Sequence, residues 1–373
     1  MADFIKLLLQ ALRIRFLKLH YPNRIGHLAL DIDCYLKEQS MAGRKVRAIA
    51  LLDGHAPANL ALIRYWSRSI TFVKGGPLGW VVSSAMKRWP ELVDDLLLYS
   101  NVTNCSARAF AVQGQWGKRR PLLSLSEADE RRGRAALSQL GVPEGAWHVC
   151  FHARSEGYSP SDERFHSHRN VDIASYMPAI EEVIARGGWC IRMGDPTMER
   201  LPPMRGVIDY AVSPFREDWL DVYLSATCRL FIGCTSGLYV LASIFGRPCA
   251  LTNMAPLDCA YSPFPSDLSI PRMMARKDGT VMSLAEAFGS EVAGFRLTHQ
   301  YLESGVSQIP NTDAEILELV RQALDEQEHG VSSLPDDEAL QSRFRSHFKE
   351  GAYCWPPASR IGREYLRRHR HLI

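Results

Sequence analysis

The sequence predicts an α/β protein in which parallel strands alternate with helices. Short apolar runs of strand length alternate with longer segments of helical periodicity. Glycine and proline end several of these segments, as Gly141 and Pro143 do after a charged helical stretch. The 373 residues allow two domains of about 150 residues each, or one large one. Repeated strand–helix units of this kind are typical of doubly wound, nucleotide-binding sheets.

The composition is that of an ordinary globular protein. Hydrophobic residues make up 46% and charged residues 23%, which excludes a disordered, collagen-like or coiled-coil chain. The 44 Lys and Arg against 41 Asp and Glu give a net charge of +3, too small to indicate a nucleic-acid partner. The nine cysteines form no CxxC pair, so neither a zinc ribbon nor a disulfide framework is indicated. We therefore expect a cytoplasmic location.

Residues 3–20 combine apolar side chains with Lys6, Arg13, Arg15 and Lys18. No apolar run in the chain reaches 18 residues, so no membrane-spanning helix is predicted. The charges within this segment argue against a signal peptide, and the pattern favours a basic amphipathic helix. Two interpretations stay open: the helix packs on the body of the protein, or it docks peripherally on an anionic inner membrane surface.

We expect an N-terminal domain over residues 1–145, a C-terminal domain over 146–335 and a helical tail over 336–373. The elements expected in the first domain are a strand, or a strand leading into a loop, over 24–32, a strand over 47–54, a helix over 59–66, a strand over 69–75, little regular structure over 105–124 and a helix over 125–145. Those expected in the second are strands over 147–154, 189–193, 228–233 and 247–252, with helices starting near 173, 218, 236 and 314.

The segment 229–253 carries the clearest functional signal. An apolar strand ends at Gly233, and a small polar turn leads into a helix. The first N–H groups of a helix lack partners and its dipole favours negative charge, so such a turn can bind a phosphate. Gly237 would let an anion approach the backbone, and Ser236 would add a hydroxyl donor. The alternative is a plain N-cap, in which Ser or Thr has its usual structural role.

Basic side chains accompany another predicted strand. Arg154 ends the predicted strand 147–154, directly after the CFHA run of residues 150–153, at the edge where open α/β sheets bind ligands. Its planar guanidinium suits a pyrophosphate; the alternative is a surface ion pair with Glu156 or Asp162. Arg169 lies in the polar loop that follows.

Two further places could take part in the chemistry. Asp195, which follows Gly194, can accept from a sugar hydroxyl or can simply cap its turn. His27 opens the first predicted strand region, with Asp31 after it, and could place a base in a cleft between the domains. The alternative is a structural histidine and a solvated loop carboxylate.

Several sites are not indicated. His152, His166 and His168 have no Cys or carboxylate at ligand spacing, so no metal site is expected. The chain contains no G-x-x-x-x-G-K-[ST] loop, no G-x-G-x-x-G after a strand and no G-x-S-x-G elbow. These absences argue against a P-loop NTPase and weaken a dehydrogenase interpretation.

An ordered set of motifs runs along nearly the whole chain: NRIGHLALDIDCYL (23–36), LLDGHAPAN (51–59), FHARSEGY (151–158), HRNVDIASYMPAI (168–180), IRMGDP (191–196), FIGCTSGL (231–238), GRPCALTN (246–253), SDLSIP (266–271), LAEAF (284–288) and NTDAEI (311–316). This set resembles bacterial glycosyltransferases often found in surface-polysaccharide gene clusters. More distantly, its HAR segment and TSG turn are similar to elements of fucosyltransferase-like and heptosyltransferase-like enzymes of the GT-B type.

The resemblance implies two Rossmann-like domains facing a cleft, the C-terminal one holding a nucleotide-sugar donor and the N-terminal one the acceptor. The tail would cross back to the first domain. The donor-binding set that we expect is Arg154, Arg169, Gly194, Asp195, Thr235, Ser236, Gly237, Leu238 and Asn253. His27 and Asp31 are the candidates for the catalytic base.

The sequence therefore predicts a glycosyltransferase, independent of metals and cofactors, that moves a sugar from a nucleotide-sugar to a surface-glycan or lipid-linked acceptor. Two other classes stay open. One is a nucleotide-sugar hydrolase or epimerase, which would turn over the donor without an acceptor. The other is a non-catalytic nucleotide-binding component of a polysaccharide assembly complex.

Overall fold

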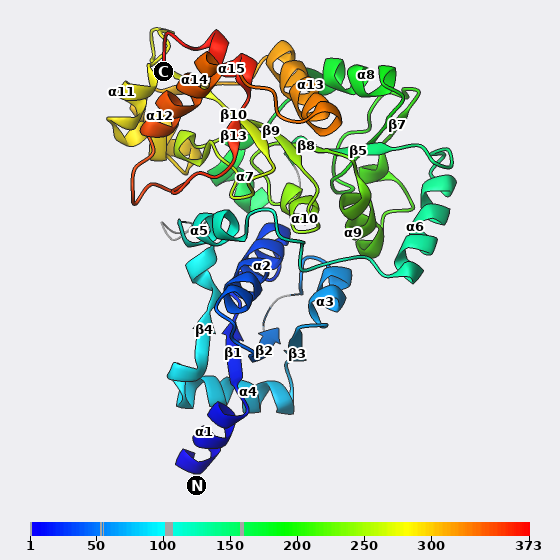
Figure 1. Cartoon of the computed structure of the whole chain (residues 1–373), viewed down its shortest axis with the longest axis vertical. Coiled ribbons are helices and arrows are strands. Elements are labelled where there is room, and N and C mark those ends of the chain that lie inside the picture. Colours follow the sequence, from blue (N-terminus) through cyan, green and yellow to red (C-terminus); the bar gives the residue numbers. More distant parts are fainter. Residues whose placement is uncertain (1, 53, 55, 101–106, 157–159) are drawn as a thin grey trace.

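Two α/β units are stacked along the long axis of the molecule (Figure 1). This computed structural model describes residues 2–52, 54, 56–100, 107–156 and 160–373. Each unit is built on a parallel sheet flanked by helices. The predicted fold class, two Rossmann-like α/β units, is confirmed.

The first unit contains a four-stranded parallel sheet of order β3-β2-β1-β4. Its strands are β1 (Ile14–Lys18), β2 (Arg47–Leu52), β3 (Ile70–Lys74) and β4 (Val93–Asp95). Its helices are α1 (Ala2–Ala11), α2 (Ile25–Met41), α3 (Leu60–Trp66), α4 (Pro77–Arg88) and α5 (Ala107–Trp116), with 3₁₀ turns η1 (Pro90–Leu92) and η2 (Leu96–Tyr99).

The second unit contains a seven-stranded parallel sheet of order β13-β10-β9-β8-β5-β6-β7. Its strands are β5 (His148–Phe151), β6 (Trp189–Arg192), β7 (Val207–Ile208), β8 (Phe231–Gly233), β9 (Cys249–Met254), β10 (Leu268–Pro271) and β13 (Arg360–Ile361); β11 (Met273–Ala275) and β12 (Ser307–Ile309) form a separate antiparallel pair. The helices are α6 (Glu127–Gln139), α7 (Pro160–His166), α8 (Met177–Ala185), α9 (Asp218–Thr227), α10 (Tyr239–Ser243), α11 (Leu284–Phe288), α12 (Thr298–Ser304), α13 (Asp313–His329), α14 (Pro335–Ser346) and α15 (Arg363–Arg368), with the 3₁₀ turn η3 (Ser167–Arg169).

Both sheets have a point at which the strand order reverses. In the first sheet this switch point lies between β1 and β4, and in the second between β5 and β8. The loops that leave the carboxyl ends of two such strands diverge to opposite sides, which opens a crevice where ligands of open α/β sheets bind. The topology therefore marks two places at which functional side chains are expected.

The segment 24–32 is helical, so the predicted strand was wrong. It opens α2, in which Leu28, Ile32 and Tyr35 recur at helical spacing and are buried. Over so short a segment, the alternation of apolar and polar residues resembled that of a strand. The helical period becomes clear only across residues 25–41, and this longer period distinguishes a helix from a strand.

The predicted single helix over residues 3–20 was also wrong. The chain forms α1 and then enters β1 after Arg13, whose φ is +56°. Phe16 and Leu17 are buried because β1 pairs with β2 and β4 on either side. Pairing with strands distant in sequence therefore overrides the local helical periodicity. No helix in the described part of the chain is both long enough and apolar enough to cross a bilayer.

Residues 105–124, which carry little regular pattern, contain α5. Phe110 of this helix lies in the hydrophobic core of the second unit, and Ala358 is an ordinary van der Waals neighbour of Gly114. The helix α6, placed by sequence in the N-terminal domain, packs in the second unit, where Gly133 faces the ring of Tyr223. The chain therefore crosses between the two units more than once.

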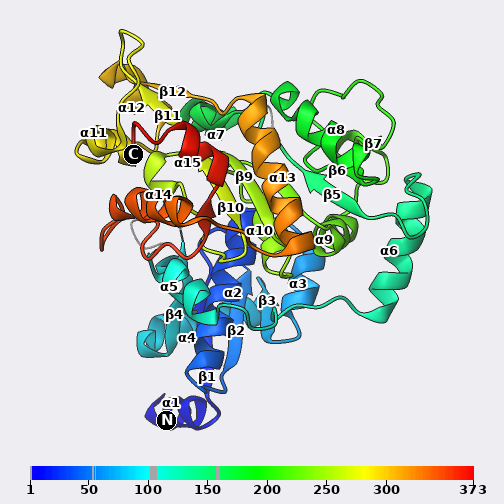
Figure 2. The same ribbon diagram turned by 45° about the horizontal axis from the view of Figure 1, so that its top comes forward.

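One cluster of buried hydrophobic side chains contains residues of both units. Leu28 and Ile32 of α2 lie in the same cluster of buried side chains as Leu241 of α10 and Ile244 just after it. Both views show α2 next to α10 (Figures 1 and 2). This shared cluster holds α2 against α10 of the second unit.

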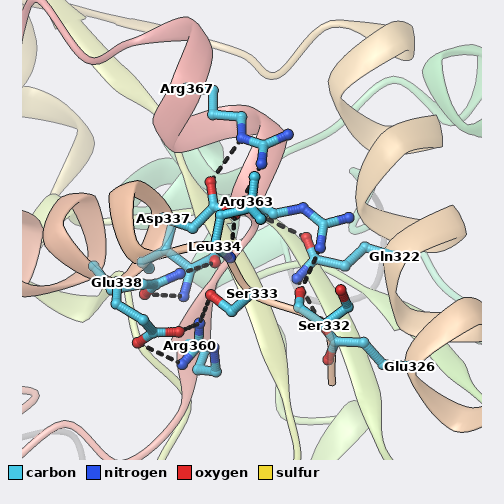
Figure 3. A network of polar contacts seen from close by, with 12 residues as sticks. Gln322, Glu326, Ser332, Ser333, Leu334, Asp337, Glu338, Arg360, Arg363 and Arg367 are labelled. Carbon is cyan, nitrogen blue, oxygen red and sulfur yellow. Dashed lines mark hydrogen bonds and ion pairs between the residues drawn. The ribbon is translucent and has the colours of Figure 1, made fainter. Parts of the chain in front are cut away.

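The tail beyond residue 335 completes the second unit. Its strand β13 pairs with β10, and a network of polar contacts ties α15 to α14 and α13 (Figure 3). Asp337, which is buried, accepts two hydrogen bonds from Arg367, at 2.7 and 2.8 Å. The tail reaches the first unit at Ala358, which lies against Gly114 of α5.

The described cysteines are all free and buried. Cys150, Cys190 and Cys249 lie in strands of the second sheet with at most 1% of their surface exposed. They pack as small core residues. Cys105 lies outside the described residues.

Candidate functional site

The switch point of the second sheet brings together the residues that carried the clearest sequence signals. Arg154 follows the carboxyl end of β5, and the turn of residues 234–238 follows that of β8. The two loops touch, since the backbone N–H of Arg154 lies 3.3 Å from the Sγ of Cys234. The structure thus places the predicted guanidinium beside the predicted phosphate-binding turn.

Arg154 is held in place by the loop that follows it. Its Nη1 donates to the carbonyl of His166 at 3.0 Å and to the side chain of Asn170, and it lies 3.5 Å from a carboxylate oxygen of Glu163. The alternative interpretation named Glu156 or Asp162 as the ion-pair partner, whereas the ion pair that the structure records for Arg154 is with Glu163. The guanidinium is half-buried, so an incoming anion would have to compete with this carboxylate.

Two more guanidinium groups lie around the same point. Arg169, in η3, and Arg272, just after β10, each act on the thiol of Cys234, as does Arg154. Burial raises the pKa of Cys234, and the backbone N–H of Arg154, followed by these three charges, opposes that rise. Positive charge is therefore concentrated at the switch point, which favours an anionic ligand there.

Arg272 was missed by the sequence reasoning. It is buried and donates to the carbonyls of His168 and Asn170, at 2.6 and 2.5 Å, and to the side chain of Asn253 at 3.3 Å. Burial lowers its pKa. The signal that identified Arg154, a basic residue directly after a strand, applies equally to Arg272.

The turn of residues 234–238 is fastened to the neighbouring strand. The hydroxyl of Thr235 accepts from the N–H of Ala255 at 2.8 Å, so it positions the turn against the end of β9. Ser236 and Leu238 are half-buried, and the helix α10 begins directly after them at Tyr239. Among the described residues, the contact recorded for the hydroxyl of Ser236 is a long one, 3.5 Å, from the N–H of Leu238. We therefore take this hydroxyl as the donor of the turn most available to a ligand.

Gly194 and Asp195 lie beyond β6, on the other side of β5 from the turn. A Cβ on Gly194 would collide with Met198. Asp195 is buried and its Oδ1 accepts from the N–H of Thr197 at 2.9 Å. Of the two roles foreseen for this carboxylate, capping the turn is the one that its contacts display.

Asn253 is buried at the end of β9 and has a φ of +52°. Its side-chain oxygen accepts from the N–H of Asn311 at 2.9 Å and from Arg272 at 3.3 Å. Its N–H in turn donates to the side chain of Asn311. These contacts occupy the side-chain oxygen and the backbone N–H of Asn253, and they fix the end of β9 next to the turn of residues 234–238.

The candidate base His27 lies in the first turn of α2, not on a strand. Its Nδ1 is 3.3 Å from Oδ2 of Asp31 and 3.2 Å from the hydroxyl of Ser100. Asp31 lies one helical turn further on and is buried, not solvated in a loop. Burial raises its pKa, and the hydrogen bond and charge of His27 oppose this.

The helix α2 carries His27 to the second unit. Gly26 packs directly on Gly237, and a Cβ built on Gly26 would lie 2.7 Å from the Cα of Gly237. The helical turn that carries the candidate base His27 therefore lies against the predicted phosphate-binding turn. The same contact covers Gly237, which leaves Thr235 and Ser236 as the parts of the turn nearer a ligand.

A second histidine–carboxylate pair was missed. His20 follows β1 and Asp95 ends β4, so both lie at the switch point of the first sheet. Nε2 of His20 is 2.7 Å from Oδ1 of Asp95. Burial acts to raise the pKa of Asp95, but the N–H of Leu97 and His20 together hold it below its usual value. The ionised carboxylate accepts from Nε2–H, which leaves Nδ1 as the basic nitrogen.

This pair connects to His27 through an aromatic contact. The ring of Tyr21 lies 6.3 Å from that of His20 and 5.0 Å from that of His27. The loop after β1 thus brings two imidazoles to the side of the first unit that faces Gly237. If residues 14–18 had been predicted as a strand, His20 would have been expected near the carboxyl end of that strand, where ligands bind. That position is the sequence signal by which His20 could have been identified.

Among the described residues, no set of three His, Cys, Asp or Glu side chains is arranged to hold a metal ion.

Comparison with known proteins finds no matching family model and no matching curated relative. Several solved structures are similar over about two thirds of this chain. A glycosyl transferase family 9 protein from Veillonella parvula aligns at 12% identity, covering 64% of this chain and 79% of that one, with a TM-score of 0.40.

The ADP-heptose lps heptosyltransferase II of E. coli aligns at 13% identity, covering 64% and 84% of the two chains, with a TM-score of 0.39. The iron-containing heptosyltransferase TibC of enterotoxigenic E. coli, described in complex with ADP-D-beta-D-heptose, aligns at 15% identity, covering 68% and 61%, with a TM-score of 0.41. At this level of similarity, the function has to be inferred from the residues of the chain itself.

Proposed function

We propose that this protein is a glycosyltransferase that moves a sugar from a nucleotide-sugar donor to a surface-glycan or lipid-linked acceptor without a metal ion. The observation that carries the proposal is the position of Arg154 and the Thr235–Ser236 turn. They flank the switch point of the second sheet, opposite the histidines of the first unit. Donor and acceptor would meet between the two units.

The leaving group determines what the donor site has to do. When the bond between the sugar and the diphosphate breaks, negative charge develops on the diphosphate, and preorganised positive charge stabilises that transition state. Arg154, Arg169 and Arg272 supply positive charge at the switch point. In the proposed complex the diphosphate takes the place of Glu163 beside Arg154 and accepts from the hydroxyl of Ser236.

The acceptor needs a base. Its hydroxyl oxygen forms the new bond to the sugar carbon, and its proton passes to a side chain of the first unit. The predicted base is His27, oriented by Asp31. The pair of His20 and Asp95 has a shorter hydrogen bond, 2.7 Å against 3.3 Å, and provides a second base of the same kind.

A thermal-shift panel of UDP, GDP, CMP and ADP tests the donor site. A ligand that binds only the folded protein raises the melting temperature, so we expect one nucleoside diphosphate to do so and to name the donor base. If no nucleotide of the panel changes the melting temperature, the proposed donor site is wrong. Donor turnover in the complete absence of acceptor would favour a hydrolase or epimerase instead.

Binding of a nucleotide without turnover of its sugar conjugates would favour a non-catalytic component. The acceptor is tested separately by supplying lipid-linked sugars and measuring transfer of radiolabel from the donor. This assay distinguishes failure of the donor site from a wrong acceptor class.

A further inference from the structure

The outer surface of the first unit carries large apolar side chains at its free end. Figure 1 shows α1 and α4 at the end of the molecule away from the second unit. Phe4 of α1 is 70% exposed and Trp80 of α4 is 72% exposed. The other exposed apolar side chains here are Ile5, Leu7, Leu8, Leu12, Leu78 and Val81. We call this set, with Phe4 and Trp80, the α1–α4 surface.

The orientation of α4 is determined by the side of the helix that packs on the sheet. Gly79 lies so close to β3 that a Cβ there would be 2.7 Å from the carbonyl oxygen of Lys74, and Val82 is buried on the same side. Residues between these positions must therefore face outward. Trp80 and Val81 are exposed because the helix is fixed by its inner side, not because the helix is loose.

The helix α1 is fixed in a similar way. Leu9 packs with Val82 and Phe16 in one small hydrophobic cluster, and Lys6 pairs with Glu91 just beyond α4. These contacts hold the inner side of α1 and leave Phe4 and its neighbours outside. The two helices are therefore joined parts of one surface.

Positive charge surrounds this surface. Residues 2–18 and 74–95 contain seven cations, Lys6, Arg13, Arg15, Lys18, Lys74, Lys87 and Arg88, against four anions, Asp3, Glu91, Asp94 and Asp95. Asp94 and Asp95 pair with Arg15 and Lys18. Arg13, Lys87 and Arg88 are exposed, and no ion pair is recorded for them within the described chain. Apolar side chains interspersed with exposed cations match a bilayer whose headgroups are negative.

We propose that the α1–α4 surface docks the protein on an anionic lipid bilayer, with Phe4 and Trp80 entering the interface and Lys87 and Arg88 contacting the headgroups. This extends the membrane contact considered for residues 3–20 alone to a second helix that the sequence did not single out. A second copy of the chain would fit less well, since a twofold pairing of this surface brings like cations together.

Vesicle sedimentation of the full chain tests the proposal. Vesicles of phosphatidylcholine containing phosphatidylglycerol are compared with phosphatidylcholine alone, without donor or acceptor, so the result is independent of the transfer reaction. We expect binding that is stronger on the anionic vesicles. The double variant Phe4→Ser/Trp80→Ser should lower the partition coefficient by about tenfold or more, while Lys87→Gln/Arg88→Gln should remove most of the preference for phosphatidylglycerol.

The matched control is Leu302→Ser, which removes an apolar side chain 76% exposed on α12 of the second unit and should bind as the wild type does. Trp80→Phe, which keeps an aromatic ring at this position, should retain binding. Wild-type binding by Phe4→Ser/Trp80→Ser, or no wild-type binding to anionic vesicles, would overturn the proposal. So would a wild-type dimer in buffer that becomes monomeric in Phe4→Ser/Trp80→Ser, because the surface would then be a protein interface.

Discussion

Gly26 and Gly237 pack backbone against backbone across the boundary between the two units. A Cβ built on either residue would lie within 2.8 Å of the other's backbone. Gly26 precedes a candidate base, and Gly237 belongs to the candidate phosphate-binding turn. The spacing between the two parts of the proposed site therefore depends on the absence of two side chains.

Gly26→Ala should destabilise the protein by about 1–3 kcal/mol, since the extra methyl group overpacks this contact. Without the clash, alanine would favour the helix by about 1 kcal/mol. The matched control is Gly114→Ala in α5, where the nearest atom is the Cβ of Ala358 at 3.6 Å, so that change should be neutral or stabilising. Urea unfolding measures both, and equal effects of the two substitutions would contradict the steric explanation.

Arg154→Ala should weaken binding of the nucleoside diphosphate identified in the panel by about tenfold or more, equivalent to at least about 1.4 kcal/mol. The reason is the loss of a charge-assisted contact to the diphosphate. Calorimetric titration measures the affinity. The control is Arg321→Ala, which removes an arginine 41% exposed on its side chain and paired with Glu182, remote in the fold on α13.

Glu163→Gln provides the opposite test at the same place. It removes the carboxylate that lies 3.5 Å from Arg154 and competes with an incoming phosphate. We therefore expect tighter nucleotide binding in Glu163→Gln than in the wild type. Unchanged affinity in both Glu163→Gln and Arg154→Ala would show that the diphosphate binds elsewhere.

His148 should make the protein less stable in mild acid. Burial lowers its pKa from 6.5 to about 4, with the carbonyl of Leu224 opposing this shift. Because the folded pKa lies below the unfolded one, the unfolded chain binds more protons between these values, and stability is lost as the pH falls through that window. The slope from this one group is up to about 1.4 kcal/mol per pH unit.

The test is the dependence of the free energy of unfolding on pH from 6.5 to 4. His148→Gln should reduce the slope, whatever it does to the stability itself. His152, whose pKa burial also lowers to about 4, contributes a slope of the same sign that remains in this variant. His329→Gln, at a histidine whose side chain is 77% exposed, should leave the slope unchanged. A slope that survives intact in His148→Gln would refute the assignment.

Arg367→Ala should destabilise the second unit by about 1–3 kcal/mol, because it leaves the buried carboxylate of Asp337 without its two strongest donors. The half-exposed position of the guanidinium keeps the effect below that of a fully buried pair. Thermal unfolding measures it. Arg370→Ala, at an exposed arginine three residues further on without a recorded ion pair in the described structure, should change the melting temperature little.

The sequence identified those parts of the site that depend on local pattern. Strand ends could be predicted from apolar runs and the glycines that stop them, so Arg154 and Ser236 were each assigned to a carboxyl edge. Pairing of strands distant in sequence could not be predicted in this way. His20 was assigned to a long helix, and Asp95 was not singled out, because neither shows its role until β1 and β4 lie side by side.

What the sequence determined by itself is the alternation of strands and helices and the small polar turn after Gly233, because both follow from periodicity and local backbone preference. Only the tertiary structure decided that residues 14–18 form a strand, that His20 meets Asp95, and that Trp80 faces outward. Each of these depends on which surface a segment buries against a distant one, and burial energy between distant segments outweighs local propensity.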